Sequence, residues 1–146
     1  MFGPETSTAN RAMIAGMLGN NSCGLHSIVW GSVRDHIVEV NALLSDGSEV
    51  IFKAEDIRKN DESNSFKEKI YSELNNLLGA EKNQSLIQNN FPKAAVSRRN
   101  SGYALDSLIK MQPFNENGET FNLCKLLADS GGTINNIGYH CIMKIW

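Results

Sequence analysis

A cluster of small residues near the N-terminus constrains the fold of this chain more than any other feature. The stretch Phe2–Asp46 opens with a Pro-led turn at Pro4, passes through a short helical segment and enters the Gly/Asn/Ser loop Gly19–Gly24. A second small-residue turn at Gly31 and Ser32 leads into an apolar strand. Because small residues leave the backbone accessible, we expect bare N–H groups near a helix end, which suit a phosphate or a polar cofactor ring. The stretch therefore predicts a cofactor-binding segment.

Length, charge and hydropathy exclude several classes of protein. A chain of 146 residues, 41% of them hydrophobic, is long enough for one domain with its own core. The formal net charge of −2 argues against a nucleic-acid partner, whose phosphates require a basic face. No apolar run reaches the length of a membrane span, and we expect no secretion signal at the N-terminus.

The cysteines indicate a reducing environment. Cys23, Cys124 and Cys141 are an odd number at irregular spacing, which does not predict a disulfide framework. Small buried hydrophobic residues in a cytoplasmic protein are the simpler interpretation. No Cys-x-x-Cys pair and no paired His spacing is present to hold zinc, so we expect no metal site.

The pattern of apolar residues predicts an α+β fold, with an antiparallel or mixed sheet flanked by helices. Strands are expected at both ends of the chain and helices between them, which is not a βαβ series. The fingerprints GxGxxG and GxxxxGK[ST] are absent, so a Rossmann fold and a P-loop NTPase are disfavoured. The expected elements are a short helix or tight turn over 10–18, a hairpin of 36–44 and 50–52 with a turn at 45–48, an amphipathic helix over 66–78, a weaker helix over 81–90, helical segments near 105–109 and 121–128, and one or two strands over 133–146.

Several short motifs, taken in order, connect the chain to a family. They are Pro4, Ala15-Gly16, the loop Gly19–Gly24, Trp30-Gly31-Ser32, Arg34-Asp35, Leu43–Gly47, the segment RRNSGYALD over Arg98–Asp106, and NLCKLLADSGGT over Asn122–Thr133. This series resembles the FAD-linked oxidase family with the vanillyl-alcohol-oxidase type of flavin domain. That family includes dehydrogenases of D-lactate, glycolate and D-2-hydroxyglutarate.

The resemblance implies a partial FAD-binding domain over residues 1–146. In the family, FAD lies between two subdomains of a PCMH-type domain, and the motifs of this chain match the second subdomain. The first subdomain supplies a Gly-rich pyrophosphate loop, which we do not find here. The sequence stops where the family's substrate cap would begin. We therefore expect a chain that lacks both the pyrophosphate-loop subdomain and the cap, as a truncated gene, a remnant or an engineered fragment.

The same resemblance implies which residues would contact FAD through hydroxyl groups and backbone. They are Pro4, Thr6, Ser7, Thr8, Gly16, Gly19, Asn20, Asn21, Ser22, Cys23, Gly24, His26, Ser27, Gly31, Gly132, Thr133, Ile134 and Ile137. Two ordinary alternatives remain open: a Ser/Thr helix cap at residues 6–8 and a tight loop with left-handed Asn at residues 19–24. Gly131 stands where the family has Glu, which puts contacts to the adenine side in doubt.

Other reactive side chains receive no catalytic role. Cys23 and His26 suggest a covalent flavin link, which we do not favour because tethering residues in such relatives belong to other segments. We expect His36 and His140 to be structural residues on strands. Arg98 and Arg99 form a loop pair that either meets a phosphate or carboxylate or is simply solvated.

Two functions from different classes follow from the sequence. The first is the FAD-binding portion of a flavin-dependent oxidoreductase, a dehydrogenase or oxidase acting on a 2-hydroxy acid or a similar CH–OH donor. The second is a non-catalytic, truncated remnant that self-associates or binds a partner through its exposed half-site. In the first case the partners are FAD and the remainder of the enzyme, and in the second case another copy or a different protein. Neither hypothesis identifies a catalytic base in this chain, so activity of the chain by itself is not expected.

Overall fold

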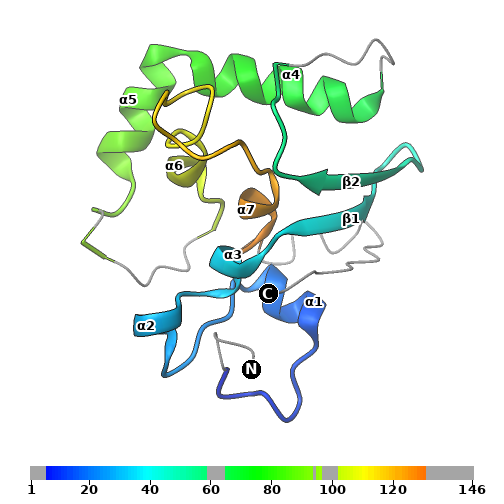
Figure 1. Ribbon diagram of the computed structural model, residues 1–146, viewed down its shortest axis with the longest axis vertical. Coiled ribbons are helices and arrows are strands. Elements are labelled where there is room, and N and C mark those ends of the chain that lie inside the picture. Colours follow the sequence, from blue (N-terminus) through cyan, green and yellow to red (C-terminus); the bar gives the residue numbers. More distant parts are fainter. Residues whose placement is uncertain (1–5, 59–64, 94, 97–101, 131–146) are drawn as a thin grey trace.

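The computed structural model describes residues 6–58, 65–93, 95–96 and 102–130. Helices dominate, and one antiparallel pair of strands crosses the middle of the molecule (Figure 1). The elements are α1 (Ile14–Gly19), α2 (Ser27–Trp30), α3 (Val33–His36), β1 (Glu39–Leu43), β2 (Glu49–Lys53), α4 (Phe66–Gly79), α5 (Glu81–Asn90), α6 (Leu105–Leu108) and α7 (Cys124–Leu127). The predicted α+β class is therefore confirmed. The strands expected over 133–146 lie outside the described residues.

The hairpin forms where alternating apolar residues flank an Asp-Gly turn. Val40 of β1 pairs with Phe52 of β2, and both are buried. The turn closes through Leu44 N and Ser48 O at 2.8 Å, and Gly47 holds the positive φ of 83° that this turn requires. The predicted hairpin is thus confirmed, although β1 begins later than expected.

His36 lies at the end of α3, so its predicted place on a strand is wrong. The helix begins because Asp35 Oδ2 accepts a hydrogen bond from Ser32 N at 2.7 Å, which satisfies a donor at the helix start. The sequence reading missed both α2 and α3, each of which is four residues long. Helices this short have almost no periodic signal.

Helix α4 is the long amphipathic helix that the spacing predicts. It begins with a capping box, in which Glu68 N donates to Ser65 Oγ at 3.3 Å and Ser65 N donates to Glu68 Oε2 at 3.0 Å. Helix α5 follows directly, as expected. The predicted segment 121–128 is helical only in α7, because Asn122 instead forms a bridge with Ala54 at the end of the hairpin.

The hairpin core lies where β2, α4 and the chain before α7 meet, and it contains four aromatic rings. Tyr71 of α4 stands between Phe52 and Phe121, with edge-to-face contacts and centroid distances of 6.1 Å on both sides. Phe114 adds a fourth ring, 6.2 Å from Phe121. Phe121 is only 1% exposed. This aromatic stack fixes the hairpin to the helices.

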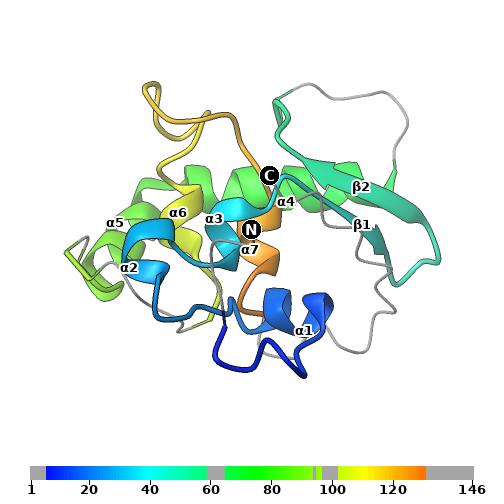
Figure 2. The same cartoon turned by 60° about the horizontal axis from the view of Figure 1, so that its bottom comes forward.

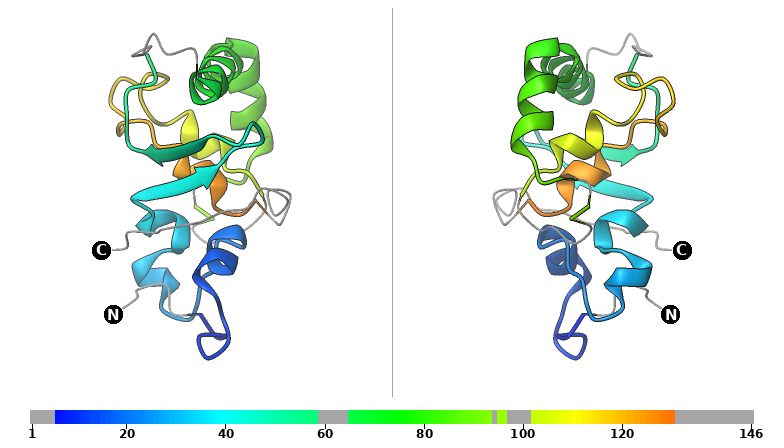
Figure 3. Two further views of the ribbon diagram at one scale, coloured as in Figure 1. Left: turned by 90° about the vertical axis from the view of Figure 1, so that its right-hand side faces the viewer. Right: turned by 90° about the vertical axis from the view of Figure 1, so that its left-hand side faces the viewer.

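The molecule has three levels in its side views (Figure 3). Helices α4 and α5 lie at one end, the hairpin and α7 in the middle, and α1, α2 and α3 toward the other end (Figures 1 and 3). We call residues 6–36, which contain the turn before α1 and helices α1 to α3, the N-terminal lobe. All of the predicted cofactor residues that the structure describes belong to this lobe.

Candidate cofactor site

The turn before α1 carries the first residues predicted to contact FAD. The Thr8 carbonyl organises it by accepting hydrogen bonds from Arg11 N and Ala12 N at 2.9 and 2.8 Å. Ser7 is exposed and Thr8 is half-buried. The Thr6 hydroxyl is buried and has no hydrogen-bond partner in the structure. Buried hydroxyls are rarely left without a partner, so an orphaned one at this position fits contact with a polar ligand.

The loop after α1 ends that helix in a Schellman motif. Ser22 N donates to Met17 O at 2.8 Å, and Asn21 N donates to Leu18 O at 2.9 Å. Asn21 has a φ of 43°, the left-handed conformation that this position requires and that glycine usually provides. The alternative of a tight loop with left-handed Asn therefore describes the backbone here.

The expectation of bare N–H groups in this loop is wrong for four residues. Besides Asn21 and Ser22, Asn20 N donates to Gly16 O at 3.1 Å, and Gly24 N donates to Ser27 Oγ at 2.7 Å. These donors are used because the loop closes back on its own helix. The loop therefore does not present a row of free N–H groups that could bind an anion.

Two glycines of α1 instead leave the backbone open. A Cβ added at Gly16 or at Gly19 would meet no atom within 4 Å. Both glycines lie on the helix that the resemblance places against the flavin. Open backbone at these glycines and an orphaned hydroxyl at Thr6, all within the N-terminal lobe, are features that a flat, polar cofactor fits. The residues present in this lobe are thus compatible with FAD.

Asn21 points its side chain into the protein. The residue is 1% exposed, and its Oδ1 accepts a hydrogen bond from Arg34 N at 2.8 Å. The contact joins the loop to the start of α3. Any contact of Asn21 with a cofactor is therefore left to its backbone. The sequence reading noted Arg34 only as part of a motif and missed this connection.

Gly31 is required by both its backbone and its surroundings. It has a φ of 74°, and an added Cβ would lie 2.5 Å from Asp35 Oδ2. That carboxylate also accepts the hydrogen bond from Ser32 N that caps α3. The absence of a side chain at Gly31 thus lets α2 turn sharply into α3. The geometry explains this glycine without a cofactor, and its contact with FAD stays a prediction.

The reactive side chains of the lobe lie at different points of its chain. Cys23 is a half-buried residue in the loop that forms no disulfide, and His26 is an exposed residue directly before α2. His36 Nε2 contacts the Trp30 carbonyl at the other end of α2. Within the described ranges, no group of three or more His, Cys, Asp or Glu side chains is arranged to hold a metal ion.

The face of the N-terminal lobe exposes an unusual number of large apolar side chains. Around α2, Leu25 and Ile28 are both 86% exposed, and Val29 and Trp30 are also largely open to solvent. At the start of α1, Met13 is 78% exposed. Figure 2 shows α1 and α2 at the near side of the molecule, away from α4. Exposed apolar side chains as close in sequence as those around α2 are typical of a surface that binds a partner.

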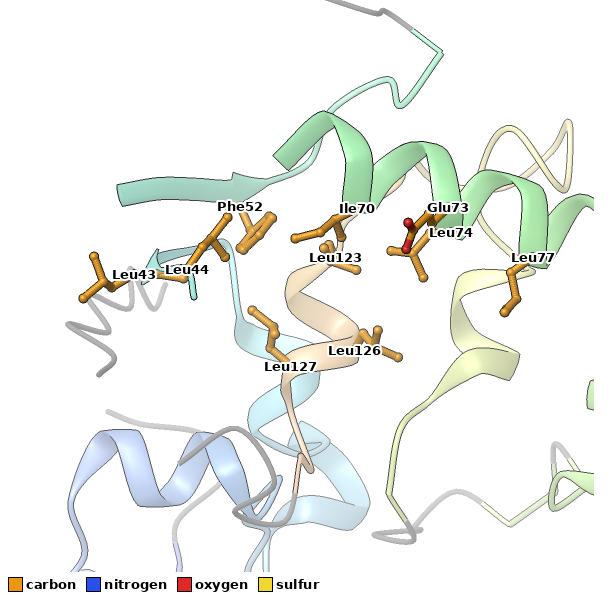
Figure 4. A pocket seen from close by; sticks show the side chains of 11 residues that line it. Leu43, Leu44, Phe52, Ile70, Glu73, Leu74, Leu77, Leu123, Leu126 and Leu127 are labelled. Carbon is orange, nitrogen blue, oxygen red and sulfur yellow. The ribbon is translucent and has the colours of Figure 1, made fainter. Parts of the chain in front are cut away.

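A second apolar feature lies on the other side of the hairpin. A groove of about 380 Å³ runs between β1, α4 and α7, and Figure 4 shows leucines projecting into it from all three. Its lining residues are Ala42, Leu43, Leu44, Phe52, Ile70, Glu73, Leu74, Leu77, Leu123, Leu126 and Leu127. The sequence reading did not find it, because helical and strand periodicities show which side chains are apolar but not which are left uncovered.

Several predicted residues lie outside the described residues. They are Pro4, Gly132, Thr133, Ile134 and Ile137 of the cofactor set, together with Arg98, Arg99 and His140. In the ranges that are described, none of the helices is both long enough and apolar enough to span a bilayer.

Comparison with known protein families matches the first part of the chain. Residues 1–53 match the family described as "FAD binding domain". The matched region contains the whole N-terminal lobe and the whole β1–β2 hairpin. It therefore includes every predicted cofactor residue except those after residue 130.

Curated relatives extend the similarity over most of the chain. The D-2-hydroxyglutarate dehydrogenase of Escherichia coli (strain K12) is 32% identical over 139 residues, which are 91% of this chain and 12% of the relative. The enzyme of the same name from Pantoea ananatis (strain AJ13355) is 30% identical, with the same coverage. That from Haemophilus influenzae (strain ATCC 51907 / DSM 11121 / KW20 / Rd) is 27% identical over 143 residues, or 13% of its length. The chain thus spans only about an eighth of these relatives. No solved structure gives a significant match.

Proposed function

We propose that this chain, which carries a flavin-domain segment of the FAD-linked oxidase family, is the FAD-binding portion of a flavin-dependent oxidoreductase acting on a 2-hydroxy acid. The match of residues 1–53 to an FAD binding domain carries this proposal. The relatives are named for D-2-hydroxyglutarate, so that hydroxy acid is the first substrate to test. The activity belongs to the complete enzyme, of which this chain provides one part.

The N-terminal lobe is the part of the chain that would hold FAD. In a PCMH-type domain the chain corresponds to the second subdomain, with Thr6 and the open glycines Gly16 and Gly19 facing the cofactor. The orphaned Thr6 hydroxyl and the unobstructed backbone of the two glycines support this assignment. When bound, FAD supplies a two-electron acceptor for the donor carbon.

We assign the exposed apolar residues around α2 to the surface that would contact the subdomain carrying the pyrophosphate loop. Leu25, Ile28, Val29 and Trp30 lie close in sequence to the loop Gly19–Gly24. The family match ends at residue 53, and the curated relatives are about eight times longer than this chain. A second body that completes the FAD site would also cover these side chains. The absence of a disulfide framework supports a cytoplasmic enzyme.

Binding of FAD to the purified chain tests the proposal. We expect a saturable change in the visible flavin spectrum on titration, with most of the colour lost on desalting. Retention is weak because the pyrophosphate contacts, each worth about 1.5–3 kcal/mol, come from the other subdomain. Riboflavin, which lacks the phosphates and adenine, is the matched ligand control. A flavin spectrum that stays unchanged at the highest FAD concentration would contradict the proposal.

Self-association is the second candidate function, and the exposed side chains of α2 favour it. Ile28 is 86% exposed and Trp30 is 58% exposed. A remnant without its enzyme would bury them against another copy or a different protein. Sedimentation velocity without flavin distinguishes the two functions. A dimer that forms with rising concentration and is abolished by Ile28→Gln supports this role, whereas a monomer at all concentrations rules out self-association.

A further inference from the structure

Arg34 lies where the N-terminal lobe meets the end of α7. The residue is 7% exposed. Its Nε donates to Lys125 O at 3.1 Å, and its Nη2 donates to Ala128 O at 2.9 Å. The same Nη2 donates to Gly102 O at 3.3 Å and lies 3.8 Å from Asp129 Oδ2. One planar guanidinium thus binds three carbonyl groups and faces one carboxylate.

The backbone of Arg34 is held from both sides. Its N–H donates to Asn21 Oδ1 at 2.8 Å, which connects it to the loop after α1. Its carbonyl accepts a hydrogen bond from Lys125 Nζ at 2.7 Å. Burial lowers the pKa of Lys125, an effect that the nearby Asp35 opposes. Side chain and backbone of Arg34 therefore connect the same two parts of the chain.

Asp129 provides a second connection between these parts. Its N–H donates to Leu18 O at 3.1 Å, and Leu18 belongs to the Schellman motif that shapes the loop. Its Oδ2 accepts a hydrogen bond from Gly102 N at 2.9 Å. Asp129 has a φ of 73°, a strained conformation that persists because these contacts hold it. The loop and the segment after α7 are thus joined at Arg34 and at Leu18.

We propose that Arg34 is a positioning residue for the FAD site: its backbone N–H holds the loop Gly19–Gly24 through Asn21 and its guanidinium holds the segment 128–130, so that the two move as one unit. The inference rests on the proposed function. The loop belongs to the predicted cofactor set, and Gly132, the next member of that set along the chain, comes three residues after Asp129. Because only 7% of Arg34 is exposed, we assign it a role through Asn21, Ala128 and Asp129 rather than through contact with the cofactor.

A lysine at position 34 could not make the contacts of the Arg34 guanidinium. The guanidinium donates in two directions at once, from Nε and Nη2, whereas an ammonium is a single point charge on a flexible stem. A purely stabilising arginine would lower the unfolding temperature without changing how the flavin is held. A positioning arginine changes the spectrum and affinity of the bound flavin as well. These readouts separate the two roles.

The test compares Arg34→Lys with Arg58→Lys in the full chain. Arg58 is the matched control, because its side chain is 62% exposed and pairs only locally with Asp56 in the described structure. Asp129→Asn is a second variant that removes the carboxylate charge facing the guanidinium and keeps a residue type that tolerates positive φ. It remains informative if Arg34→Lys fails to fold.

With FAD, we expect Arg34→Lys to weaken binding by about tenfold or more, the equivalent of about 1.4 kcal/mol. The visible circular dichroism of the bound flavin should change shape, and Arg58→Lys should match the wild type. Millimolar guanidinium added to Arg34→Ala should partly restore both readouts. An unchanged affinity and spectrum in a folded Arg34→Lys would overturn the proposal.

Amide hydrogen exchange tests the same inference without flavin. Arg34→Lys should speed exchange at Asn21, Ser22 and Asp129 together and leave the hairpin residues Val40 and Phe52 unchanged. Unchanged exchange at these three amides would overturn the proposal. If the wild-type chain binds no FAD but the three amides respond together, the proposed function fails while the coupling by Arg34 stands.

Discussion

The hairpin core and the N-terminal lobe differ in the burial of their large apolar side chains. In the core, Phe52, Tyr71 and Phe121 are buried and stack edge to face. In the lobe, Ile28 and Trp30 lie on a helix of four residues and are mostly exposed. The difference shows that the aromatic side chains of the core are enclosed by the described chain, whereas those around α2 are left open to solvent.

The contrast also explains how each region is held. The core is held by burial of closely packed apolar side chains, so its stability depends on how well they fit together. The lobe uses a helix cap, a left-handed Asn and the buried Arg34, which fix the backbone while leaving side chains outside. A surface built in this way keeps its shape before the cofactor arrives.

The largest expected effect comes from emptying the core. Phe121→Ala removes a ring that is 1% exposed and contacts two other rings. We expect a loss of about 3–5 kcal/mol in the free energy of unfolding, measured by urea denaturation. A loss below about 1 kcal/mol would contradict a complete core. Phe121→Leu is the matched variant and should lose less.

A smaller effect is expected from a glycine that shapes the lobe. Gly31→Ala forces a Cβ into a φ of 74° and to within 2.5 Å of Asp35 Oδ2. The free energy of unfolding should fall by about 1–3 kcal/mol. Gly47→Ala carries the strained φ of 83° with no atom within 4 Å of the added Cβ, so it should lose less. Equal losses would show that the contact with Asp35 has no effect.

The core should also respond to alkaline pH through Tyr71. Burial, followed by its hydrogen bond to Glu55, raises the pKa of Tyr71 above its ordinary value of 10.0. A raised pKa means that the folded state holds this proton more tightly than the unfolded state does. The contribution of Tyr71 to the free energy of unfolding is therefore complete below pH 10 and declines above it. The free energy of unfolding should fall by up to about 1.4 kcal/mol per pH unit.

Tyr71→Phe tests this pH dependence. At pH 7 it should cost about 1 kcal/mol because the hydrogen bond to Glu55 is lost. Above pH 10 its unfolding free energy should fall less steeply than that of the wild type. Urea denaturation at several pH values measures both. Parallel pH curves for the two proteins would contradict the role of this tyrosine.

The smallest effect is expected at the exposed face of the lobe. Ile28→Gln replaces a side chain that is 86% exposed, so the free energy of unfolding should change by no more than about 0.5 kcal/mol. Thermal unfolding of the monomer measures it. A loss as large as that of Phe121→Ala would mean that α2 is packed in solution, and the comparison between the two regions would fail.

Sequence reasoning found the elements whose signals are local. The hairpin was predictable from its alternating residues and the Asp46-Gly47 turn, and α4 from its helical spacing. The motifs of the N-terminal stretch also indicated the FAD-linked oxidase family, and residues 1–53 match an FAD binding domain.

The internal contacts of the site were not predictable in the same way. The contact between Arg34 and Lys125 spans 91 residues. Helical and strand periodicities concern neighbouring residues and cannot predict such a contact. The alternative of a left-handed Asn in the loop Gly19–Gly24 proved right at Asn21, whereas the expected free N–H groups were wrong because the Schellman motif uses them. Helices α2 and α3 depend on Ser32, Asp35 and the turn at Gly31 rather than on helical spacing.

A pair of glycine substitutions tests most directly whether the lobe faces FAD. Gly16 and Gly79 both lie in helices with room for a Cβ, since the nearest atom is beyond 4 Å at Gly16 and is Phe114 Cε1 at 4.0 Å at Gly79. Alanine at Gly16 should therefore stabilise the fold, by about 0.5–1 kcal/mol, and alanine at Gly79 should be tolerated. The account predicts that only Gly16→Ala weakens FAD binding in a titration followed by flavin absorbance. Equal FAD affinity in both variants and the wild type would contradict it.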